Sequence, residues 1–235
     1  MNPSFMHIKT IFFDADDTLW VNETHYRNTE RAFFKLIGLN EQDGIRELLH
    51  TEMQNMPLYG YGAKAFTLSM LETAQRILGA QQAAAVTAPV LELGKKLIAA
   101  PMELLPGVRQ TLQELAPFYT LAVATKGDLL DQQRKLQNSG LRDFFAHAEI
   151  MTDKTPQAYL NLCRALKTEP AHTLMVGNSV RSDILPALEA GLQAVYIPCQ
   201  DGWIYEEAPN TPLPDFVTLK NIQELPALLK GETHA

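Results

Sequence analysis

The chain has 235 residues, of which 46% are hydrophobic and 20% charged, and its formal net charge is −7. This composition is that of a folded globular protein and excludes the disordered and fibrous classes. The acidic balance gives no reason to expect a nucleic acid or an anionic membrane as partner, and no apolar run approaches the ~20 residues that a membrane helix needs.

The N-terminal segment and the cysteines favour a cytoplasmic location. The first ten residues, MNPSFMHIKT, lack a basic stretch followed by a long apolar one, so no secretory signal is visible. Cys163 and Cys199 lie far apart in the sequence and are interpreted as reduced core residues. The oligomeric state is not readable from these features.

Short apolar segments typical of strands alternate with helical patterns along most of the chain. The predicted strands are 7–13, 119–125, 146–152, 172–178 and 194–198, and the helices are 105–116, 127–140, 155–168 and 182–191, with a last strand and helix in 216–229. Thr155 followed by Pro156 is an expected helix start, and Gly140 and Gly191 are expected helix stops. The alternation predicts an α/β fold with a doubly wound, Rossmann-like parallel sheet.

One stretch contains no convincing strand. Four helical patterns with apolar stripes occupy residues 28–38, 45–56, 65–78 and 86–99. The stripe of the second is Ile45, Leu48, Leu49, Met53 and Met56, and that of the third is Leu68, Leu71, Ala74 and Leu78. We therefore expect a small α-helical bundle, 20–103, inserted as a cap into an α/β core of residues 1–19 and 104–235.

Polar side chains follow four of the predicted strands. They are Asp14, Asp16 and Asp17; Thr125, Lys126 and Gly127; Asp153 and Lys154; and Asn178, Ser179 and Asp183. Ligands of an open parallel sheet bind outside the carboxyl ends of its strands, so these groups are expected to converge. Clustered carboxylates repel one another unless a positive charge lies between them. Carboxylate and amide oxygens suit Mg²⁺, and a lysine with a hydroxyl suits phosphate.

Each of these residues also has a structural interpretation. Thr125 suits a strand end, Lys154 a solvated loop and Asp183 a helix cap. Residues 126–128 fit a tight turn in which Asp128 is a helix N-cap. We favour this structural role for Lys126, but Lys126 and Gly127 also remain candidate substrate-binding residues. Because such groups follow all four strands in order, we favour a functional interpretation of the whole set over the separate structural ones.

The motifs DADDT (14–18), TKG (125–127), Lys154 and GNSVRSD (177–183) together resemble the four motifs of the haloacid dehalogenase-like phosphohydrolases. The resemblance covers nearly the full chain. It includes a helical cap inserted after the first motif and LPGV (105–108) where the core resumes.

The resemblance implies a role for each motif residue. Asp14 would be the nucleophile that forms an aspartyl-phosphate, and Asp16 the general acid and base. Thr125 would bind the phosphoryl group and Lys154 would neutralise its charge. Mg²⁺ would be held by Asp14, Asp16 (through its backbone carbonyl), Asn178 and Asp183, the last directly or through water.

Two residues depart from the family pattern. Asn178 stands where members most often have Asp, which removes one negative charge and predicts weaker Mg²⁺ binding. Thr155 separates Lys154 from Pro156, where the proline usually follows the lysine directly; this affects the expected loop geometry.

The predicted activity is Mg²⁺-dependent hydrolysis of a small phosphorylated metabolite. Asp16 argues against a dehalogenase, because cleavage of a carbon–halogen bond needs no protonated leaving group. A sugar phosphomutase and a catalytically weak phospho-acceptor or binding protein remain the alternatives.

The expected selectivity segment is PLYGYGAKAF (57–66). Its Tyr61 and Lys64 are candidate substrate-binding residues, with a plain helix–helix loop as the structural alternative, and His25 and Tyr26 are weaker candidates. The DADxTL form resembles nucleotidase-like members, which points to a nucleoside monophosphate or a similar phosphomonoester.

Overall fold

The computed structural model describes residues 5–199 and 212–231. The chain divides into two compact units. Residues 1–21, 102–126 and 134–235 group as one, the core unit, and residues 22–101 and 127–133 as the other, the helical unit. No helix in the described ranges is long and apolar enough to cross a membrane.

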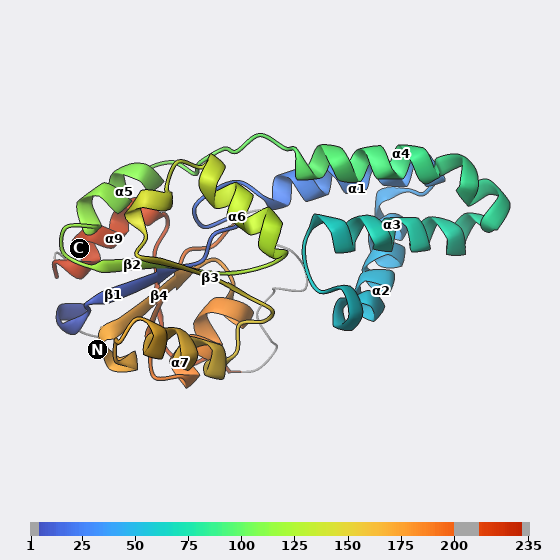
Figure 1. The fold of residues 1–235 in the computed structure, drawn as a ribbon. Helices are drawn as coiled ribbons and strands as arrows, with labels where there is room; N and C mark the ends of the chain where they lie inside the picture. The colour runs from blue at the N-terminus through green and yellow to red at the C-terminus, as the bar shows by residue number, and fades with distance from the viewer. Residues whose placement is uncertain (1–4, 200–211, 232–235) are drawn as a thin grey trace. The chain divides into compact units, whose positions relative to one another are not determined.

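The core unit is built on a six-stranded parallel sheet (Figure 1). Its strands are β1 Thr10–Phe13, β2 Thr120–Lys126, β3 His147–Met151, β4 Thr173–Gly177, β5 Gln193–Tyr196 and β6 Val217–Thr218. Their spatial order is β3-β2-β1-β4-β5-β6, and every neighbouring pair is parallel. The predicted α/β class with a doubly wound parallel sheet is therefore confirmed.

Successive strand residues point to opposite faces, so each face carries its own apolar core. Ile11 and Phe13 of β1 belong to the cluster that contains α5 Val108–Leu115 and α9 Leu225–Leu229. Phe12, between them, belongs to the cluster on the other face, with α7 Pro156–Ala165 and α8 Leu185–Glu189. Figure 1 shows α7 on the opposite side of the sheet from α5 and α9.

The predicted helix start at Thr155 and the predicted helix stops at Gly140 and Gly191 are confirmed. The Thr155 side chain accepts a hydrogen bond from the Ala158 N–H at the start of α7, and Pro156 occupies the first helical position. Gly140 follows α6 Leu129–Asn138 and Gly191 follows α8. Both glycines have left-handed φ angles, +63° and +83°, which a side chain would disfavour.

The turn after β1 is fixed by backbone pairing. The Asp17 N–H donates to the Trp20 carbonyl at 2.8 Å, and Trp20 forms an antiparallel bridge with Leu104. The Val21 N–H donates to the Glu103 carbonyl at 2.9 Å. The segments that leave and re-enter the core unit are thus hydrogen-bonded to each other next to Trp20, which also bridges to Asp16.

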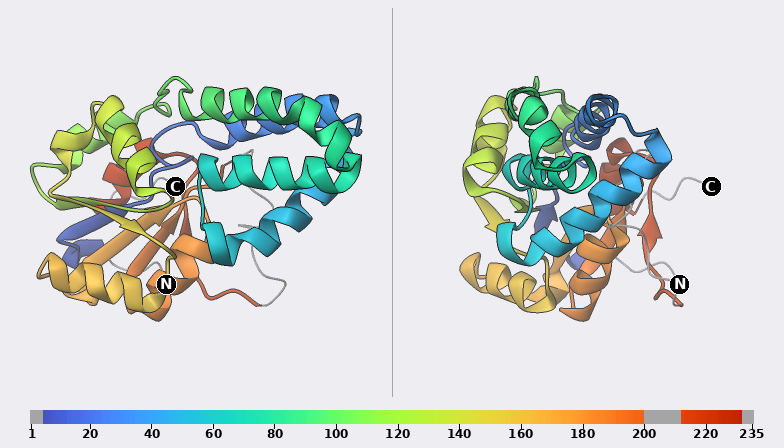
Figure 2. Two further views of the ribbon diagram at one scale, coloured as in Figure 1. Left: turned by 45° about the vertical axis from the view of Figure 1, so that its right-hand side comes forward. Right: turned by 90° about the vertical axis from the view of Figure 1, so that its right-hand side faces the viewer.

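The helical unit contains α1 Glu23–Ile37, α2 Glu41–Tyr59, α3 Ala63–Leu78 and α4 Ala80–Ile98 (Figure 2). Residues 22–101 form no strand, as the sequence predicts. Its buried apolar cluster is contributed by all four helices: Phe33, Phe34, Ile37, Leu48, Ala63, Phe66, Met70, Ala74, Val90 and Leu97.

The predicted apolar stripes of α2 and α3 are only partly correct. Leu48 and Ala74 are buried, but Leu68 is 43% exposed. The contact between these helices also contains buried polar pairs beside the apolar cluster: Asn55 Nδ2 donates to Ser69 Oγ at 3.1 Å and Thr73 Oγ1 to Thr51 Oγ1 at 2.8 Å. Apolar periodicity cannot predict such a contact, because its buried residues are polar and form hydrogen bonds with one another.

A charged cluster joins α1 and α2 in the helical unit. Arg27 forms ion pairs with Glu23 at 3.3 Å and with Glu30 at 3.0 Å. Burial raises the pKa of Glu52 to about 8; the nearby Glu30 carboxylate adds to the increase, while Arg27 opposes it. The folded protein therefore keeps a proton on Glu52 that the unfolded chain releases above about pH 4.5.

Glu52→Gln is expected to flatten the dependence of stability on pH. Because the folded-state pKa is raised, the contribution of Glu52 is fully present below about pH 4.5 and is lost as pH rises through about 8. As pH rises from 5 to 9, we expect the free energy of unfolding of the variant to increase relative to wild type by on the order of 2 kcal/mol. This is less than the full pKa shift implies, because the side chain is half-buried. Urea unfolding across this range measures the difference.

The matched control is Glu92→Gln on α4. The pKa of Glu92 is lowered by its hydrogen bond with Lys95, so it does not titrate in this range. Equal pH profiles for wild type and Glu52→Gln would contradict the assignment.

Candidate active site

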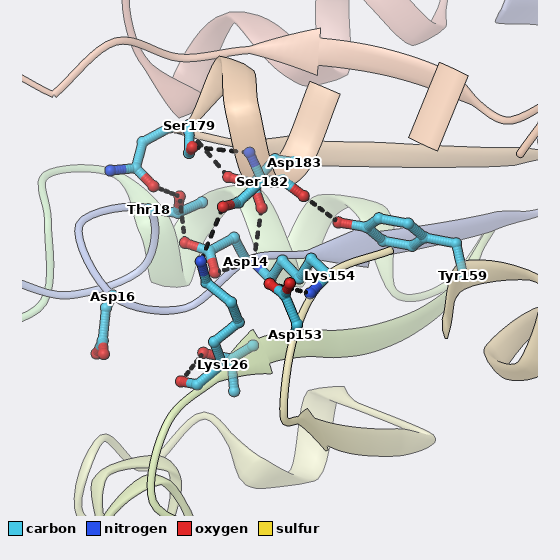
Figure 3. A network of polar contacts seen from close by, with 12 residues as sticks. Asp14, Asp16, Thr18, Lys126, Asp153, Lys154, Tyr159, Ser179, Ser182 and Asp183 are labelled. Carbon is cyan, nitrogen blue, oxygen red and sulfur yellow. Dashed lines mark hydrogen bonds and ion pairs between the residues drawn. The ribbon is translucent and has the colours of Figure 1, made fainter. Parts of the chain in front are cut away.

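Lys154 lies at the centre of the polar network at the carboxyl ends of the strands (Figure 3). It follows β3, and its Nζ donates to Oδ1 of Asp14, directly after β1, and to Oδ1 of Asp183 at 2.6 Å. Lys154 is 5% exposed and Asp183 only 1%. The predicted residues Asp14, Lys154 and Asp183 therefore meet in one buried cluster, and the solvated-loop interpretation of Lys154 is wrong.

The cluster has more negative than positive charge. The pKa of Asp14 is raised to about 7: burial is the largest cause, Lys154 opposes the increase, and Asp183 and Asp16 add to it. Burial also opposes the charge of Lys154, yet Asp14 and Asp183 raise the pKa of this ammonium well above its ordinary value. One permanently charged ammonium is thus shared by two buried carboxylates.

Thr18 links the first motif to the fourth. Its Oγ1 lies 3.1 Å from Asp14 Oδ2 and 3.3 Å from Asn178 Oδ1. A hydroxyl has one hydrogen to donate, so these two acceptor oxygens face a single donor. The Asp14 carboxylate and the Asn178 amide, predicted as metal ligands, therefore lie beside each other.

Asp183 is held by the loop that follows β4. Its Oδ2 accepts a hydrogen bond from the Ser179 N–H at 2.9 Å, and Ser179 itself caps the π-helical turn Val180–Ile184 by accepting from the Ser182 N–H. A Cβ at Gly177 would collide with the Asp183 carboxylate. Gly177 thus provides the space that Asp183 occupies.

The second motif contributes another cation. Lys126 Nζ donates to Ser182 Oγ at 2.8 Å, and the Ser182 carbonyl accepts from the Tyr159 hydroxyl at 3.2 Å. Thr125 is buried, and its Oγ1 donates to the Lys126 carbonyl at 3.3 Å. Gly127 has a φ of +135°, a conformation that favours glycine. The sequence analysis assigned no role to Ser182, although it lies inside the GNSVRSD motif, nor to Tyr159 of α7, which matches no motif.

Asp16 lies apart from the network around Lys154 (Figure 3). Its Oδ1 accepts a hydrogen bond from the Trp20 indole N–H at 2.7 Å, and Lys135 Nζ lies 3.0 Å from each of its carboxylate oxygens. Neither Trp20 nor Lys135 was predicted. Lys135 lies 119 residues from Asp16 in an ordinary helical pattern, so the sequence offers no signal for the pair.

The predicted cap residues lie in the helical unit. Lys64 Nζ forms an ion pair with Asp128 Oδ2 at 2.8 Å, and Asp128 Oδ1 accepts from the Asp131 N–H at 3.0 Å, as an N-cap of α6. Partial burial of Asp128 favours a raised pKa, but the hydrogen bonds from Lys64 and Asp131 outweigh it and lower the pKa. Tyr61 lies between Gly60 and Gly62, both with positive φ, in the loop that joins α2 to α3.

The oxygens of the core unit fit a hard divalent cation. Burial, followed by the neighbouring carboxylates of Asp183 and Asp16, disfavours the charge of Asp14, and Lys154 alone does not offset these effects on its pKa. No group of three or more His, Cys, Asp and Glu side chains suited to a metal occurs in residues 5–199 and 212–231, so the donors would be mixed: the Asp14 carboxylate, the Asn178 amide oxygen and backbone carbonyl oxygen. Mg²⁺ accepts such a set, since it binds one or two carboxylates and keeps several waters.

Comparison with known proteins gives consistent results. A model of the haloacid dehalogenase-like hydrolase family matches residues 8–191. The chain is 24% identical to N-acylneuraminate-9-phosphatase of Rattus norvegicus, over 95% of this chain and 94% of the relative. It is 26% identical to a pyrimidine 5'-nucleotidase of Escherichia coli, over 93% and 96%.

A solved structure with similar coverage supports the same family. The structure of a haloacid dehalogenase-like family hydrolase from Xanthomonas campestris superposes with a TM-score of 0.85, at 32% identity, and covers 99% of this chain and 94% of that one. The predicted family and the prediction of a hydrolase are confirmed.

Lys154→Met is expected to destabilise the protein by about 3 kcal/mol at pH 8, because it leaves Asp14 and Asp183 buried without their shared cation. Chemical unfolding in EDTA measures the change without a contribution from bound metal. Lys126→Met is the matched control, since Lys126 is half-buried and bonds to a neutral serine; we expect it to cost about 1 kcal/mol. Equal losses for the two variants would contradict the central role of Lys154.

Proposed function

Since the chain belongs to the haloacid dehalogenase-like hydrolases, we propose that it is a phosphatase that hydrolyses a small phosphomonoester through an aspartyl-phosphate on Asp14. The observation that supports this most is the buried bond of Lys154 to both Asp14 and Asp183. Lys154 lowers the pKa of Asp14 against the effect of burial, which favours the ionised nucleophile, and it places beside that nucleophile a cation that can receive phosphoryl oxygens. The names of the relatives support a phosphate ester, since each of the two is described as a phosphatase or a nucleotidase.

The reaction has two balanced steps. An Asp14 oxygen attacks phosphorus, the bond to the leaving oxygen breaks, and Asp16 gives its proton to that oxygen so that an alcohol departs. Asp16 then takes a proton from water as the water oxygen attacks phosphorus and the Asp14 carboxylate is released. Phosphate leaves and Asp16 is protonated again, so the enzyme returns to its starting state.

Three further groups are assigned to the transferred phosphoryl group. Thr125 and the Gly127 backbone donate hydrogen bonds to it, and Lys126 supplies a second positive charge beside Lys154. Each acts by positioning and charge stabilisation, the main contributions in phosphoryl transfer. The bond of Lys126 to Ser182 would be exchanged for one to a phosphoryl oxygen.

Mg²⁺ would be held by the Asp14 carboxylate, the Asp16 backbone carbonyl and the Asn178 amide oxygen, with Asp183 directly or through water. When bound, the cation supplies a Lewis acid that offsets the charge of the phosphoryl oxygens. Asn178 in place of a carboxylate gives weaker binding, because one negative charge is missing.

We assign residues 20–103 to a cap that selects the substrate, in which Tyr61 and Lys64 contact the leaving group of the phosphate ester. The relatives named above act on different phosphate esters, so the assignment stops at a small phosphorylated metabolite, with a nucleoside monophosphate as one member of the class.

Asp14→Asn is expected to lower kcat for p-nitrophenyl phosphate with Mg²⁺ by at least about 10³-fold, because an amide oxygen is a far weaker nucleophile. EDTA is expected to abolish wild-type turnover. The control Asp17→Asn lies in the same turn at a φ of 60°, which Asn also adopts, and should stay within about threefold of wild type. Undiminished hydrolysis by Asp14→Asn, or no phosphate release by wild type, would refute the proposal.

Lys64→Ala is expected to raise KM for the best metabolite in a screened panel by about tenfold, since a charged contact is lost, while kcat for p-nitrophenyl phosphate stays unchanged. Asp128→Asn keeps the helix cap but frees Lys64, so it should not raise KM. If both variants raise KM alike, the Lys64–Asp128 pair matters for structure and the selectivity role is wrong.

A further inference from the structure

Asp16 has a set of partners that is separate from that of Asp14. The Lys135 ammonium lies 3.0 Å from both Asp16 oxygens, and the Trp20 indole N–H donates to one of them at 2.7 Å. The side chains of Lys135 and Asp16 are 18% and 24% exposed, so the pair is largely shielded from water. Each carboxylate of the turn that matters for the proposed reaction thus has its own lysine.

The anchors of Asp16 are themselves fixed. Trp20 is buried, its carbonyl accepts from the Asp17 N–H, and its backbone bridges to Leu104. Lys135 lies on α6 beside Leu136, which is buried in the core cluster. A bond to both oxygens fixes the plane of a carboxylate, and the indole N–H can only donate, so the two anchors restrict the Asp16 rotamer.

We propose that Lys135, together with Trp20, is a positioning residue that orients Asp16 for proton transfer to the leaving oxygen. The ammonium favours the ionised carboxylate, so its contribution is orientation and not acidity. This inference rests on the acid role given to Asp16 in the proposed function. Proton transfer depends first on the distance and direction between donor and acceptor. A carboxyl group that is free to rotate spends most of its time in orientations from which this transfer cannot occur. Lys135 does not touch the reacting atoms; it acts through Asp16.

The readout is the dependence of rate on the leaving group. Aryl phosphates with acidic phenols leave without a proton, whereas esters of weakly acidic alcohols need one. The slope of log(kcat/KM) against leaving-group pKa therefore measures proton donation. A purely structural loss lowers all rates by one factor and leaves the slope unchanged, so partial unfolding of a variant does not imitate the effect.

The experiment compares wild type, Lys135→Met, Lys135→Arg and Asp16→Asn over a series of aryl and alkyl phosphates with Mg²⁺. We expect Lys135→Met to steepen the slope, with a loss of roughly ten- to hundredfold for alkyl phosphates and less than about threefold for p-nitrophenyl phosphate. Lys135→Arg should restore most of the loss, because its guanidinium also bonds both oxygens. Lys95→Met, which removes a lysine paired with Glu92 on α4, is the control and should match wild type.

Two outcomes separate this inference from the proposed function. If Asp16→Asn leaves the slope unchanged, the acid role of Asp16 fails. If Asp16→Asn steepens the slope but Lys135→Met leaves it unchanged or makes it shallower, the positioning role alone is overturned. In the Asp16→Asn background, Lys135→Met should change the slope no further, because both substitutions remove the same proton transfer.

Discussion

The burial of one ammonium between two carboxylates is the constraint on which the site depends. Moving Lys154, Asp14 and Asp183 out of water is costly, and only close, well-directed bonds between them offset that cost. Those bonds require the ends of β1, β3 and β4 to lie near one another, which the parallel order β3-β2-β1-β4 provides. Gly177 is part of the same requirement, because any side chain there would displace Asp183.

The same turn holds a second carboxylate in different surroundings. Asp14 is buried with Lys154, whereas Asp16 is partly exposed and bonded to Lys135 and Trp20. Two carboxylates in unlike environments are suited to different tasks, one as nucleophile and one as acid and base. The backbone bridge from Trp20 to Leu104 ties this arrangement to the point where the chain re-enters the core unit.

Much of this was predictable, because strand exits and helix caps are local features. The alternation of apolar strands with helices identified the sheet, and Thr155 followed by Pro156 identified the start of α7. The motif residues identified the cluster around Lys154. The sequence could not predict Lys135 or Tyr159, because nothing local distinguishes a helical lysine or tyrosine that meets a distant turn. The polar part of the α2–α3 contact was not predicted for the same reason. Asn55 and Ser69 can be buried because they hydrogen-bond to each other, but each alone resembles a surface residue.

The most direct test of the account is to locate the covalent intermediate. Wild-type protein is mixed with an excess of a hydrolysed phosphomonoester and Mg²⁺, quenched during turnover and treated with hydroxylamine, which converts an acyl phosphate to a hydroxamate. Peptide mapping by mass spectrometry then identifies the modified side chain. We expect a hydroxamate on Asp14; modification of a different residue, or turnover without any modification, would contradict the role of Asp14 as nucleophile.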